Sequence, residues 1–485
     1  MSGAERTDHT TARAAAGAKL RADGSGDAAV AAFLDAFDRL AAGDTGTIGE
    51  DEITGVANLP DADLLPAPGQ ADLEALDHTV VVKLNGGLGT SMGLTGPKSL
   101  LPVRGGDTFL DLTALSLLDL RSRTGHQVPL VLMNSFATRT PSLAALARHG
   151  DLSGTLPKDF LQNRVPKLDA DTLAPAEHPA APELTWAPPG HGDFYPALAG
   201  SGMLDSLLGQ GFRYAFVSNI DNLGAVLDPR ILGHVVATGV PFLMEVADRT
   251  AADRKGGHLA RRRVAAGGDG DGDGDGDGTS GAGQSGGLVL REIAQTRGED
   301  LDAFADTETH RYFNTNSIWV DLPALKTAMD AAGGVLSLPM IVNRKTVDPA
   351  DPGSTRVVQL ETAMGAAIAT FDVAGALRVP RSRFLPVKTT NDLLVLRSDA
   401  YQVADGALRL VPGRTAAPLV DLDGHFALVG DFDRRFPGGP PSLVGADRLT
   451  VRGDVVFGHG VTVRGTVAVV AEDPFTVPDG AVLTG

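Results

Sequence analysis

Short apolar runs alternate with stretches of helical spacing through the middle of the chain. Runs of this kind occupy residues 79–82, 128–133, 214–217 and 242–246. Each has the length and composition typical of a buried strand. The alternation predicts an α/β protein with a mixed, mainly parallel sheet flanked by helices, in which ligands lie beyond the carboxyl ends of the strands.

Residues 11–42 are rich in alanine and predict an N-terminal helical segment. The apolar residues from Val30 to Phe37 follow the helical period. Gly24 and Gly26 precede them and are expected to interrupt the helix.

The end of the chain carries a hexapeptide repeat. Two series of apolar residues recur at intervals of six, and glycines stand between them. This period is typical of a β-helix, in which each short strand forms one side of a triangular coil. Only about two coils are present, so the repeat is expected to need another domain or subunit to cap it. The series are Leu449, Val455, Val461, Val467 and Val451, Phe457, Val463, Val469, with glycines at 453, 458, 460 and 465.

The stretch from Lys83 to Val103, KLNGGLGTSMGLTGPKSLLPV, follows directly on one of the predicted strands. Its glycines have no Cβ, so their backbone can approach a phosphate or a base and offer N–H groups to it. Lys98 adds a positive charge. The stretch therefore predicts a phosphate-binding turn at the carboxyl end of a strand.

Two standard phosphate-binding motifs do not fit this turn. A Walker A loop has glycine directly before Lys-Ser, but Pro97 stands there and has no N–H to donate. The dinucleotide motif begins at Gly87 and Gly89, but Met92 holds the place of its third glycine. A plain glycine-rich surface loop remains the alternative for the glycines alone.

The turn as a whole resembles the eukaryotic-type UTP:glucose-1-phosphate uridylyltransferase family, in which LNGGLGTSMG followed by GPKS is a long and specific pattern. Further blocks recur in the family's order. The resemblance is close over residues 75–400 and looser beyond them. The blocks are WAPPGHGD (186–193), FVSNIDNLG (216–224), MEVADRTAADRKGG (244–257), FNTNSIW (313–319), QLETAMGAA (359–367) and VPRSRFLPVKTT (379–390).

The resemblance implies three parts. Residues 1–75 form an N-terminal helical segment, and residues 76–400 form a glycosyltransferase-A-like catalytic domain. Residues 401–485 form a C-terminal domain that ends in a short left-handed β-helix. Family members often use that domain for contacts between subunits, so a homo-oligomer through the β-helix is an expectation.

Composition excludes several classes of protein. The 42 basic and 60 acidic residues give a net charge of −18, which repels nucleic acid and anionic membranes at long range. The chain has no cysteine, which excludes disulfides, thiolate nucleophiles and Cys-ligated zinc. Neither a signal segment nor an apolar run of membrane-spanning length is recognised, so a cytoplasmic location is expected.

The family's reaction transfers a uridylyl group from UTP to glucose 1-phosphate and releases pyrophosphate. Both substrates are anions, so the site needs lysines, backbone N–H groups and a magnesium ion rather than a covalent nucleophile. By resemblance, Lys98 meets the phosphates of the nucleotide and Lys388 meets the phosphates undergoing transfer. The alternatives are a solvated surface lysine for Lys98 and a salt bridge to Asp392 for Lys388.

Asp221 follows a predicted strand and is expected to hold the magnesium ion. One well-placed carboxylate is adequate, because Mg²⁺ keeps most of its waters. The alternative is an Asx-type turn in which Asp221 caps Leu223. The resemblance implies that Asn219 contacts the ribose or the phosphates of the nucleotide.

Recognition of uracil needs a donor and an acceptor that read its imide edge. Gln162 in FLQNR matches the family's glutamine and offers both from one amide. An exposed loop amide is the alternative for Gln162. The resemblance adds backbone groups of Leu84, Asn85, Gly86, Gly87 and Gly190.

Recognition of the sugar phosphate falls, by resemblance, to residues that suit hydroxyl groups, which both donate and accept hydrogen bonds. His191 has two alternatives: contact with the phosphate of the sugar, or a structural role in which Asp193 fixes it. A metal-binding role for His191 is not expected, because no His or Cys stands at ligand spacing. The sugar-phosphate residues are His191, Asn314, Asn316, Glu361 and Lys388.

Residues 264–287 depart from the family and contain five Asp-Gly repeats between Asp269 and Gly278. Carboxylates at regular spacing suggest calcium, but neither the EF-hand pattern nor the nonapeptide calcium repeat fits. A disordered insertion in a surface loop is predicted, with a strand resuming at Leu288.

Other functions compete with the glucose enzyme. A broader UDP-sugar pyrophosphorylase, or one for N-acetylhexosamine 1-phosphates, shares a similar glycine loop, but the blocks QLETAMG and PVKTTND favour glucose. A catalytically silent sensor of sugar nucleotides would need affinity but not Lys388. A calcium-binding surface protein rests on the Asp-Gly repeats alone.

Overall fold

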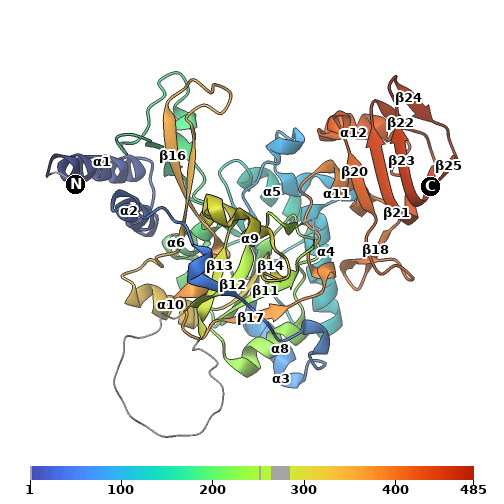
Figure 1. Cartoon of the computed structure of the whole chain (residues 1–485). Coiled ribbons are helices and arrows are strands. Elements are labelled where there is room, and N and C mark those ends of the chain that lie inside the picture. Colours follow the sequence, from blue (N-terminus) through green and yellow to red (C-terminus); the bar gives the residue numbers. More distant parts are fainter. Residues whose placement is uncertain (1–2, 251–252, 264–284) are drawn as a thin grey trace, which may run out of the picture. The chain divides into compact units, whose positions relative to one another are not determined.

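The computed structural model describes residues 3–250, 253–263 and 285–485. Helices and strands alternate along the chain, as the hydrophobic pattern predicts (Figure 1). Contacts divide the chain into two compact units. Unit 1 comprises Met1–Thr79, Gln162–Val217 and Pro229–Pro380, and unit 2 comprises Val80–Leu161, Ser218–Asp228 and Arg381–Gly485.

The helical structure predicted for residues 11–42 is confirmed as two helices of unit 1, α1 (Gly3–Ala22) and α2 (Asp27–Ala41). Gly24 lies between them with φ +85°, a conformation that glycine adopts without strain. The helices bury Phe33 and Phe37 in one apolar cluster with Val358 and Leu360 of β16 (Arg356–Thr362). Helix α2 also packs on α6 (Phe194–Gly200).

Unit 1 contains strands of a mixed sheet in the order β1-β12-β14-β10, and β14 also pairs with β11. The pairing of β11 with β17 is parallel, but β1–β12, β12–β13, β12–β14 and β11–β14 are antiparallel. The expectation of a mainly parallel sheet is therefore wrong for this unit, because β12 pairs antiparallel with β13, and β14 pairs antiparallel with both β11 and β12. The strands are β1 (Ile53–Gly55), β10 (Tyr214–Asn219), β11 (Phe242–Asp248), β12 (His258–Arg263), β13 (Ser285–Arg291), β14 (Tyr312–Asp321) and β17 (Gly375–Arg378).

Other helices and strands complete unit 1. Strand β15 pairs with β16 in a hairpin, and β16 contains Glu361. The elements are α3 (Gln70–Glu74), β7 (Val165–Pro166), β8 (Leu168–Asp169), β9 (Trp186–Ala187), α7 (Met203–Gly209), α8 (Pro229–Thr238), α9 (Leu301–Ala305), α10 (Leu322–Ala331) and β15 (Met340–Thr346).

Unit 2 holds parallel strands in the order β2-β5-β6, connected through helices as in other α/β proteins. Helix α4 begins at a capping box in which Thr108 and Asp111 bond each other's backbone. The predicted strands at residues 79–82 and 128–133 are confirmed. The elements are β2 (Thr79–Asn85), β3 (Pro102–Arg104), β4 (Asp107–Thr108), α4 (Phe109–Thr124), β5 (Leu130–Asn134), α5 (Arg139–Leu146) and β6 (Asp159–Leu161).

The C-terminal part of unit 2 forms parallel strands in two sheets, β20-β21-β23-β25 and β22-β24 (Figure 1). Residues of the hexapeptide series such as Leu449, Val455 and Val461 are fully buried. Gly453 has φ +93°, and a Cβ there would lie 2.0 Å from the carbonyl oxygen of Ala471, so only glycine fits this position. The elements are α11 (Thr390–Arg397), β18 (Tyr401–Ala404), β19 (Ala407–Leu410), β20 (Leu419–Leu422), α12 (Val429–Arg435), β21 (Ser442–Arg452), β22 (Val455–Phe457), β23 (Thr462–Val470), β24 (Phe475–Val477) and β25 (Val482–Thr484).

The predicted insertion lies largely outside the described residues, which omit 264–284. The strand predicted to resume at Leu288 begins earlier, at Ser285. Ser285 pairs with Arg263, the last residue of β12. The chain thus leaves β12 and enters β13 at neighbouring positions.

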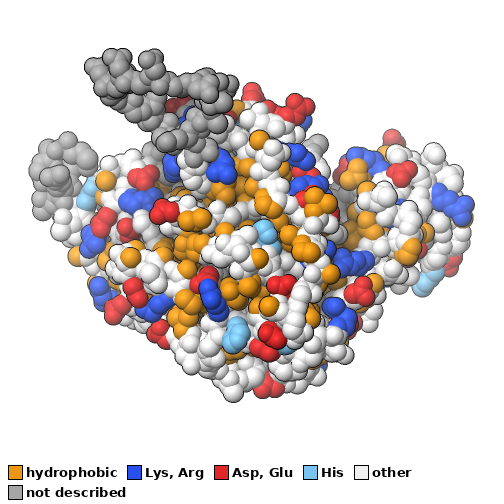
Figure 2. Space-filling view, turned by 90° about the horizontal axis from the view of Figure 1, so that it is seen from below, with side chains coloured by type: hydrophobic (Ala, Val, Ile, Leu, Met, Phe, Trp, Pro, Cys, Tyr) orange, Lys and Arg blue, Asp and Glu red, His pale blue; other side chains and the backbone are white. Residues whose placement is uncertain are grey.

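Charged side chains of both signs are interspersed on the face drawn in Figure 2. The net charge of −18 is not gathered there into one acidic patch. In the described part of the chain, no helix has the length and the apolar character needed to cross a membrane.

Candidate functional site

The glycine turn follows β2 in unit 2, as predicted. Its start is tied to the segment after β10, because the N–H of Ile220 donates to the carbonyl of Leu84 at 3.2 Å. The N–H of Lys98 donates to the carbonyl of Gly87 at 3.1 Å and so closes the turn. These bonds bring Lys98 back to the carboxyl end of β2.

The two neighbouring residues of the turn contribute differently. The side chain of Asn85 is buried and donates to Asn134 Oδ1 at 2.7 Å and to Ser142 Oγ at 2.8 Å, so only its backbone is available to a nucleotide. Ser135 Oγ donates to the carbonyl of Gly86 at 3.0 Å. The turn is thus anchored by side chains that the sequence alone does not single out.

Lys98 and Asp221 form an ion pair, with 2.6 Å between Nζ and Oδ2. Lys98 Nζ also donates to the carbonyl of Val387. The two side chains are 16% and 22% exposed, so a solvated surface lysine is the wrong description of Lys98. Asn222, rather than Asp221, makes the Asx-type turn, because its Oδ1 accepts from the N–H of Gly224 at 3.1 Å.

Asn219 and Asp221 lie at the carboxyl end of β10, where an α/β protein is expected to bind ligands. Asn219 is half-buried. The N–H of Val387 donates to the carbonyl of Asp221 at 3.4 Å, so the segment that carries Lys388 is bound directly to the segment that carries Asp221.

Lys388 follows Val387 and has an exposed side chain. The predicted alternative, a salt bridge to Asp392, is wrong. Asp392 accepts hydrogen bonds from the backbone N–H groups of Lys388 at 2.8 Å and Thr389 at 2.9 Å, and thereby caps α11. In the described part of the chain, the ammonium group of Lys388 has no hydrogen bond, so it is free to bind an anion.

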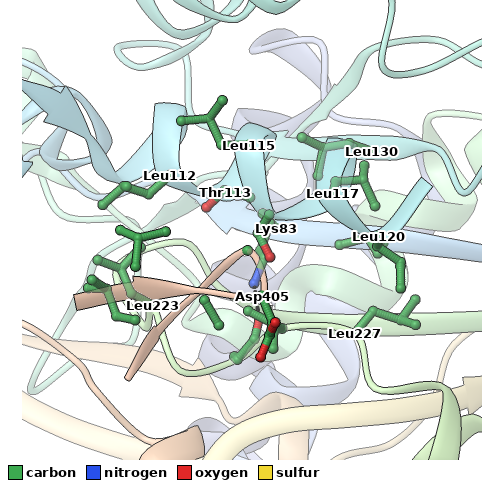
Figure 3. A pocket seen from close by; sticks show the side chains of 18 of the residues that line it. Lys83, Leu112, Thr113, Leu115, Leu117, Leu120, Leu130, Leu223, Leu227 and Asp405 are labelled. Carbon is green, nitrogen blue, oxygen red and sulfur yellow. Dashed lines mark hydrogen bonds between the residues drawn. The ribbon is translucent and has the colours of Figure 1, made fainter. Parts of the chain in front are cut away.

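A cavity of about 300 Å³ also lies in unit 2 (Figure 3). Leucine side chains of α4 and of the segment after Asn222 line it. Lys83 Nζ donates to Ser218 Oγ at 2.7 Å and to the carbonyl of Ala225 at 2.6 Å. The predicted site residues do not line this cavity.

Unit 1 brings together three of the predicted sugar-phosphate residues. Asn314 Nδ2 donates to Asn316 Oδ1 at 3.2 Å, and Asn316 N–H donates to Asn314 Oδ1 at 2.9 Å. Asn316 Nδ2 lies 3.3 Å from His191 Nε2. Asn316 has φ +58°, in a bulge where the register between β11 and β14 shifts. Asparagine adopts this left-handed conformation more readily than most residues other than glycine.

His191 is fixed by a backbone group rather than by Asp193. Its Nδ1 accepts a hydrogen bond from the N–H of Met364 at 2.8 Å, so the proton of the neutral ring lies on Nε2. Burial lowers the pKa of His191 to about 4, and the ring is therefore neutral at pH 7. His191 Nε2–H and Asn316 Nδ2 are both donors and can meet one oxygen acceptor.

Glu361 lies close to the turn that contains His191. Asn343 Nδ2 donates to Glu361 Oε1 at 3.0 Å across the β15–β16 hairpin. Gly190 has φ +79°, and a Cβ there would lie 2.4 Å from the carbonyl oxygen of Thr362. Glycine at this position therefore allows the turn to pack directly on the end of β16.

The residues assigned to recognition of the uracil base belong to both units. Gln162 and Gly190 belong to unit 1, and the glycine turn belongs to unit 2. Gln162 is half-buried. The alternative interpretation, in which Gln162 is an exposed loop residue, therefore does not describe it.

Sequence reasoning missed the groups that hold the predicted residues in place. They are the carbonyl of Val387 for Lys98, the N–H of Met364 for His191, and Asn343 for Glu361. Every residue has a backbone N–H or carbonyl group, so the residue type does not indicate which of these groups will make a contact. The contact of Asn343 with Glu361 can be predicted only when the register of β15 and β16 is known.

Unit 2 therefore has a glycine turn after a strand, and Lys98 pairs there with the carboxylate of Asp221. Lys98 also contacts Val387, which directly precedes Lys388. Among the described residues, no group of three or more His, Cys, Asp or Glu side chains could hold a metal ion. Phosphate groups are the ligands that such a site suits, and its chemistry is typical of a nucleotidyltransferase.

Comparisons with known proteins agree with this class. The family model of UTP–glucose-1-phosphate uridylyltransferase matches residues 30–265 and 275–464. The UTP–glucose-1-phosphate uridylyltransferase of Hordeum vulgare is 41% identical over 426 residues, which cover 86% of this chain and 84% of the relative. The protein of the same name from Saccharomyces cerevisiae is 41% identical over 413 residues, 84% of this chain and 77% of the relative. The chain belongs to the UTP–glucose-1-phosphate uridylyltransferase family.

Solved structures support the same assignment. UDP-glucose pyrophosphorylase from Leishmania major, known in open and closed structures, superimposes with a TM-score of 0.88 at 43% identity, covering 98% of both chains. UDP-glucose phosphorylase from Trypanosoma brucei gives a TM-score of 0.83 at 44% identity, with the same coverage.

Proposed function

We propose that this protein transfers UMP from UTP to glucose 1-phosphate and produces UDP-glucose and pyrophosphate. The observation that carries the proposal is that Lys98, Asp221 and Lys388 meet at Val387. The carbonyl of Val387 accepts a hydrogen bond from Lys98 Nζ, and the N–H of Val387 donates to the carbonyl of Asp221. Lys388 is the next residue. Family membership supports the choice of substrates, since the relatives are named for UTP and glucose 1-phosphate.

The reaction needs no proton transfer to the nucleophile, because a phosphate oxygen of glucose 1-phosphate is already anionic. That oxygen forms a bond to the α-phosphorus of UTP, and the bond from the α-phosphorus to the bridging oxygen of the β-phosphate breaks. Lys98 binds the phosphates of UTP, and Lys388 stabilises the charge that develops on the transferred phosphate. Pyrophosphate leaves with the electron pair of the broken bond.

Magnesium fits the residues that meet at Val387. Asp221 is partly exposed and uses Oδ2 for Lys98, so Oδ1 remains for a cation. One carboxylate is adequate, because the ion takes its other ligands from water and from substrate phosphates. When bound, Mg²⁺ neutralises phosphate charge.

The residues of unit 1 are assigned to recognition. Gln162 reads the imide edge of uracil with its amide, and the backbone of Gly190 assists it. Neutral His191 and Asn316 donate to a sugar or phosphate oxygen, and Glu361 accepts from a sugar hydroxyl. The low pKa of His191 is consistent with this role, because the ring is neutral at pH 7 and its Nε2–H can donate.

The C-terminal strands of residues 401–485 are proposed to wind as a left-handed β-helix and to mediate contacts between subunits. Parallel pairing of β21, β23 and β25 supports the coil. Exposed apolar side chains on its last strands, such as Val470 and Phe475, support a partner surface. The division at residues 75 and 400 and the cytoplasmic location also remain proposals.

The test is release of pyrophosphate from purified protein, UTP, Mg²⁺ and glucose 1-phosphate. Release is expected with glucose 1-phosphate and not in its absence. Equal rates with galactose 1-phosphate or N-acetylglucosamine 1-phosphate would replace the glucose-specific function by a broader one. Binding of UTP without pyrophosphate release would contradict enzymatic activity.

A further inference from the structure

Asn163 follows Gln162, and Asp193 holds it through both carboxylate oxygens. The N–H of Asn163 donates to Asp193 Oδ2 at 2.7 Å, and Asn163 Nδ2 donates to Asp193 Oδ1 at 2.9 Å. Asp193 is only 4% exposed, so water does not compete for these bonds. The two bonds fix both the backbone and the side chain of Asn163.

The next residue, Arg164, is also fixed. Its Nε donates to Asp23 Oδ2 at 2.7 Å, and its guanidinium lies 4.6 Å from the centre of the Trp186 ring. Gln162, by contrast, has no side-chain hydrogen bond within the described part of the chain. The structure thus holds the two residues after Gln162 and leaves the amide of Gln162 available for a ligand.

We propose that Asp193 is a positioning residue for base recognition: by clamping Asn163 it sets the direction of the Gln162 amide. This inference rests on the proposed contact of Gln162 with uracil. Discrimination between uracil and cytosine depends on a donor and an acceptor held in register, so a loose amide that can rotate would select poorly.

The charge state of Asp193 gives the inference a second readout. Burial raises the pKa of Asp193 to about 7, despite the two bonds from Asn163. The ionised carboxylate accepts both bonds, whereas a protonated oxygen faces an N–H donor and loses one of them. A small cavity beside Asp193 is lined by α2, which contributes only apolar side chains there, and by Glu361 of β16. His191 lies two residues away and is neutral above pH 5.

The clamp therefore loosens as the pH falls through about 7, and KM for UTP is expected to rise below that pH. Asp193→Asn presents an amide N–H₂ to one of the two donors at every pH. It should raise KM for UTP by about three- to tenfold, leave kcat within about twofold, and lower the preference for UTP over CTP. The dependence of KM on pH near 7 should disappear in this variant.

The experiment measures kcat and KM for UTP and CTP between pH 6 and 8 in the full-length enzyme. It compares Asp193→Asn, Gln162→Ala and the double variant. If Asp193 acts through Gln162, the effect of Asp193→Asn vanishes in the Gln162→Ala background. Additive effects, or an unchanged KM in Asp193→Asn, would overturn the inference. An unchanged KM and UTP preference in Gln162→Ala would instead overturn the proposed role of Gln162.

Two further variants separate positioning from folding. Asp321→Asn is the matched control, because Asp321 is a buried carboxylate of unit 1 that caps α10 through the N–H of Ala324. It should lower Tm and leave KM for UTP unchanged. If Asp193→Asn does not fold, Asn163→Ala removes only the side-chain bond, and it must raise KM for UTP if the inference is correct.

Discussion

At the scale of single residues, the two lysines differ in what already holds them. Lys98 is bound by Asp221 and Val387, whereas the ammonium group of Lys388 has no hydrogen bond within the described residues. Interactions that form only in the transition state raise kcat rather than affinity. Lys388→Ala is therefore expected to lower kcat by about 10²- to 10³-fold and to change KM for UTP little.

Steady-state kinetics check this expectation, with Lys158→Ala as the control at another exposed lysine of unit 2. A near-normal kcat with a raised KM would make Lys388 a binding residue only.

The pKa of His191 gives a prediction about stability. Its value of about 4 in the folded protein lies below the ordinary 6.5, so the unfolded chain binds more protons between these values. Stability from this group is present above pH 6.5 and is lost as the pH falls towards 4. Asp193 acts in the opposite direction, because its pKa is raised from 3.8 to about 7.

His191→Gln removes only the first of these two contributions. The free energy of unfolding at pH 5, relative to its value at pH 7, should therefore be higher in the variant than in the parent by about 2 kcal/mol. Thermal unfolding at both pH values measures it. An equal change between the two pH values in the variant and the parent would mean that the ring is not buried as described.

At the scale of elements, the turn before α6 requires glycine at position 190. A Cβ at Gly190 would collide with the carbonyl of Thr362, and its φ of +79° disfavours other residues. Gly190→Ala is expected to cost about 2–4 kcal/mol and to raise KM for both substrates. Gly202 is the matched control, because it has φ +74° and open space around a Cβ. Gly202→Ala should cost only about 1 kcal/mol and leave kinetics unchanged; equal costs would show that the contact with Thr362 is unimportant.

The elements also show which parts of the fold could be predicted from the sequence. Apolar runs predicted β2, β5, β10 and β11, since each strand is buried and its own residues carry the signal. The antiparallel pairing of β12 with β13, and the bulge that places Asn316, depend on which segments become neighbours. Likewise, Lys98 and Val387 are 289 positions apart and meet only in the folded chain. Periodicity within one segment contains no information about such pairings.

At the scale of the whole molecule, the C-terminal strands share an apolar cluster with earlier parts of unit 2. Phe436 stacks on Phe457 with 5.0 Å between ring centres, and Leu443 and Leu449 are fully buried in the same cluster as Phe432. Truncation after Pro437 would expose Phe432 and its neighbours, at about 2 kcal/mol for each large side chain.

The truncated chain is therefore expected to lose stability or to change its mass in solution, as thermal unfolding and light scattering would measure. The assigned catalytic residues all precede residue 400, so a truncated chain that folds should still release pyrophosphate. A stable truncation of unchanged mass without activity would place an essential group in the C-terminal strands.

The Asp-Gly tract provides another prediction at this scale. A Gly-Ser linker of about four residues should replace residues 264–284, because Arg263 and Ser285 are paired and a short turn can join them. The activity and Tm are expected to stay unchanged, with or without calcium. A Tm that rises with calcium in the parent, and not in the replacement, would assign a calcium site to the tract.

The pairing of Arg263 with Ser285 also has a consequence for how this protein can evolve and be engineered. Any sequence that joins these positions starts and ends at adjacent points of a closed hairpin. Each doubling of its length costs only about 0.6 kcal/mol of chain entropy. Mutational drift can therefore lengthen or shorten this connection under weak selection. For the same reason, a fluorescent reporter whose own termini lie close together could be inserted between β12 and β13, giving a labelled enzyme without a terminal fusion.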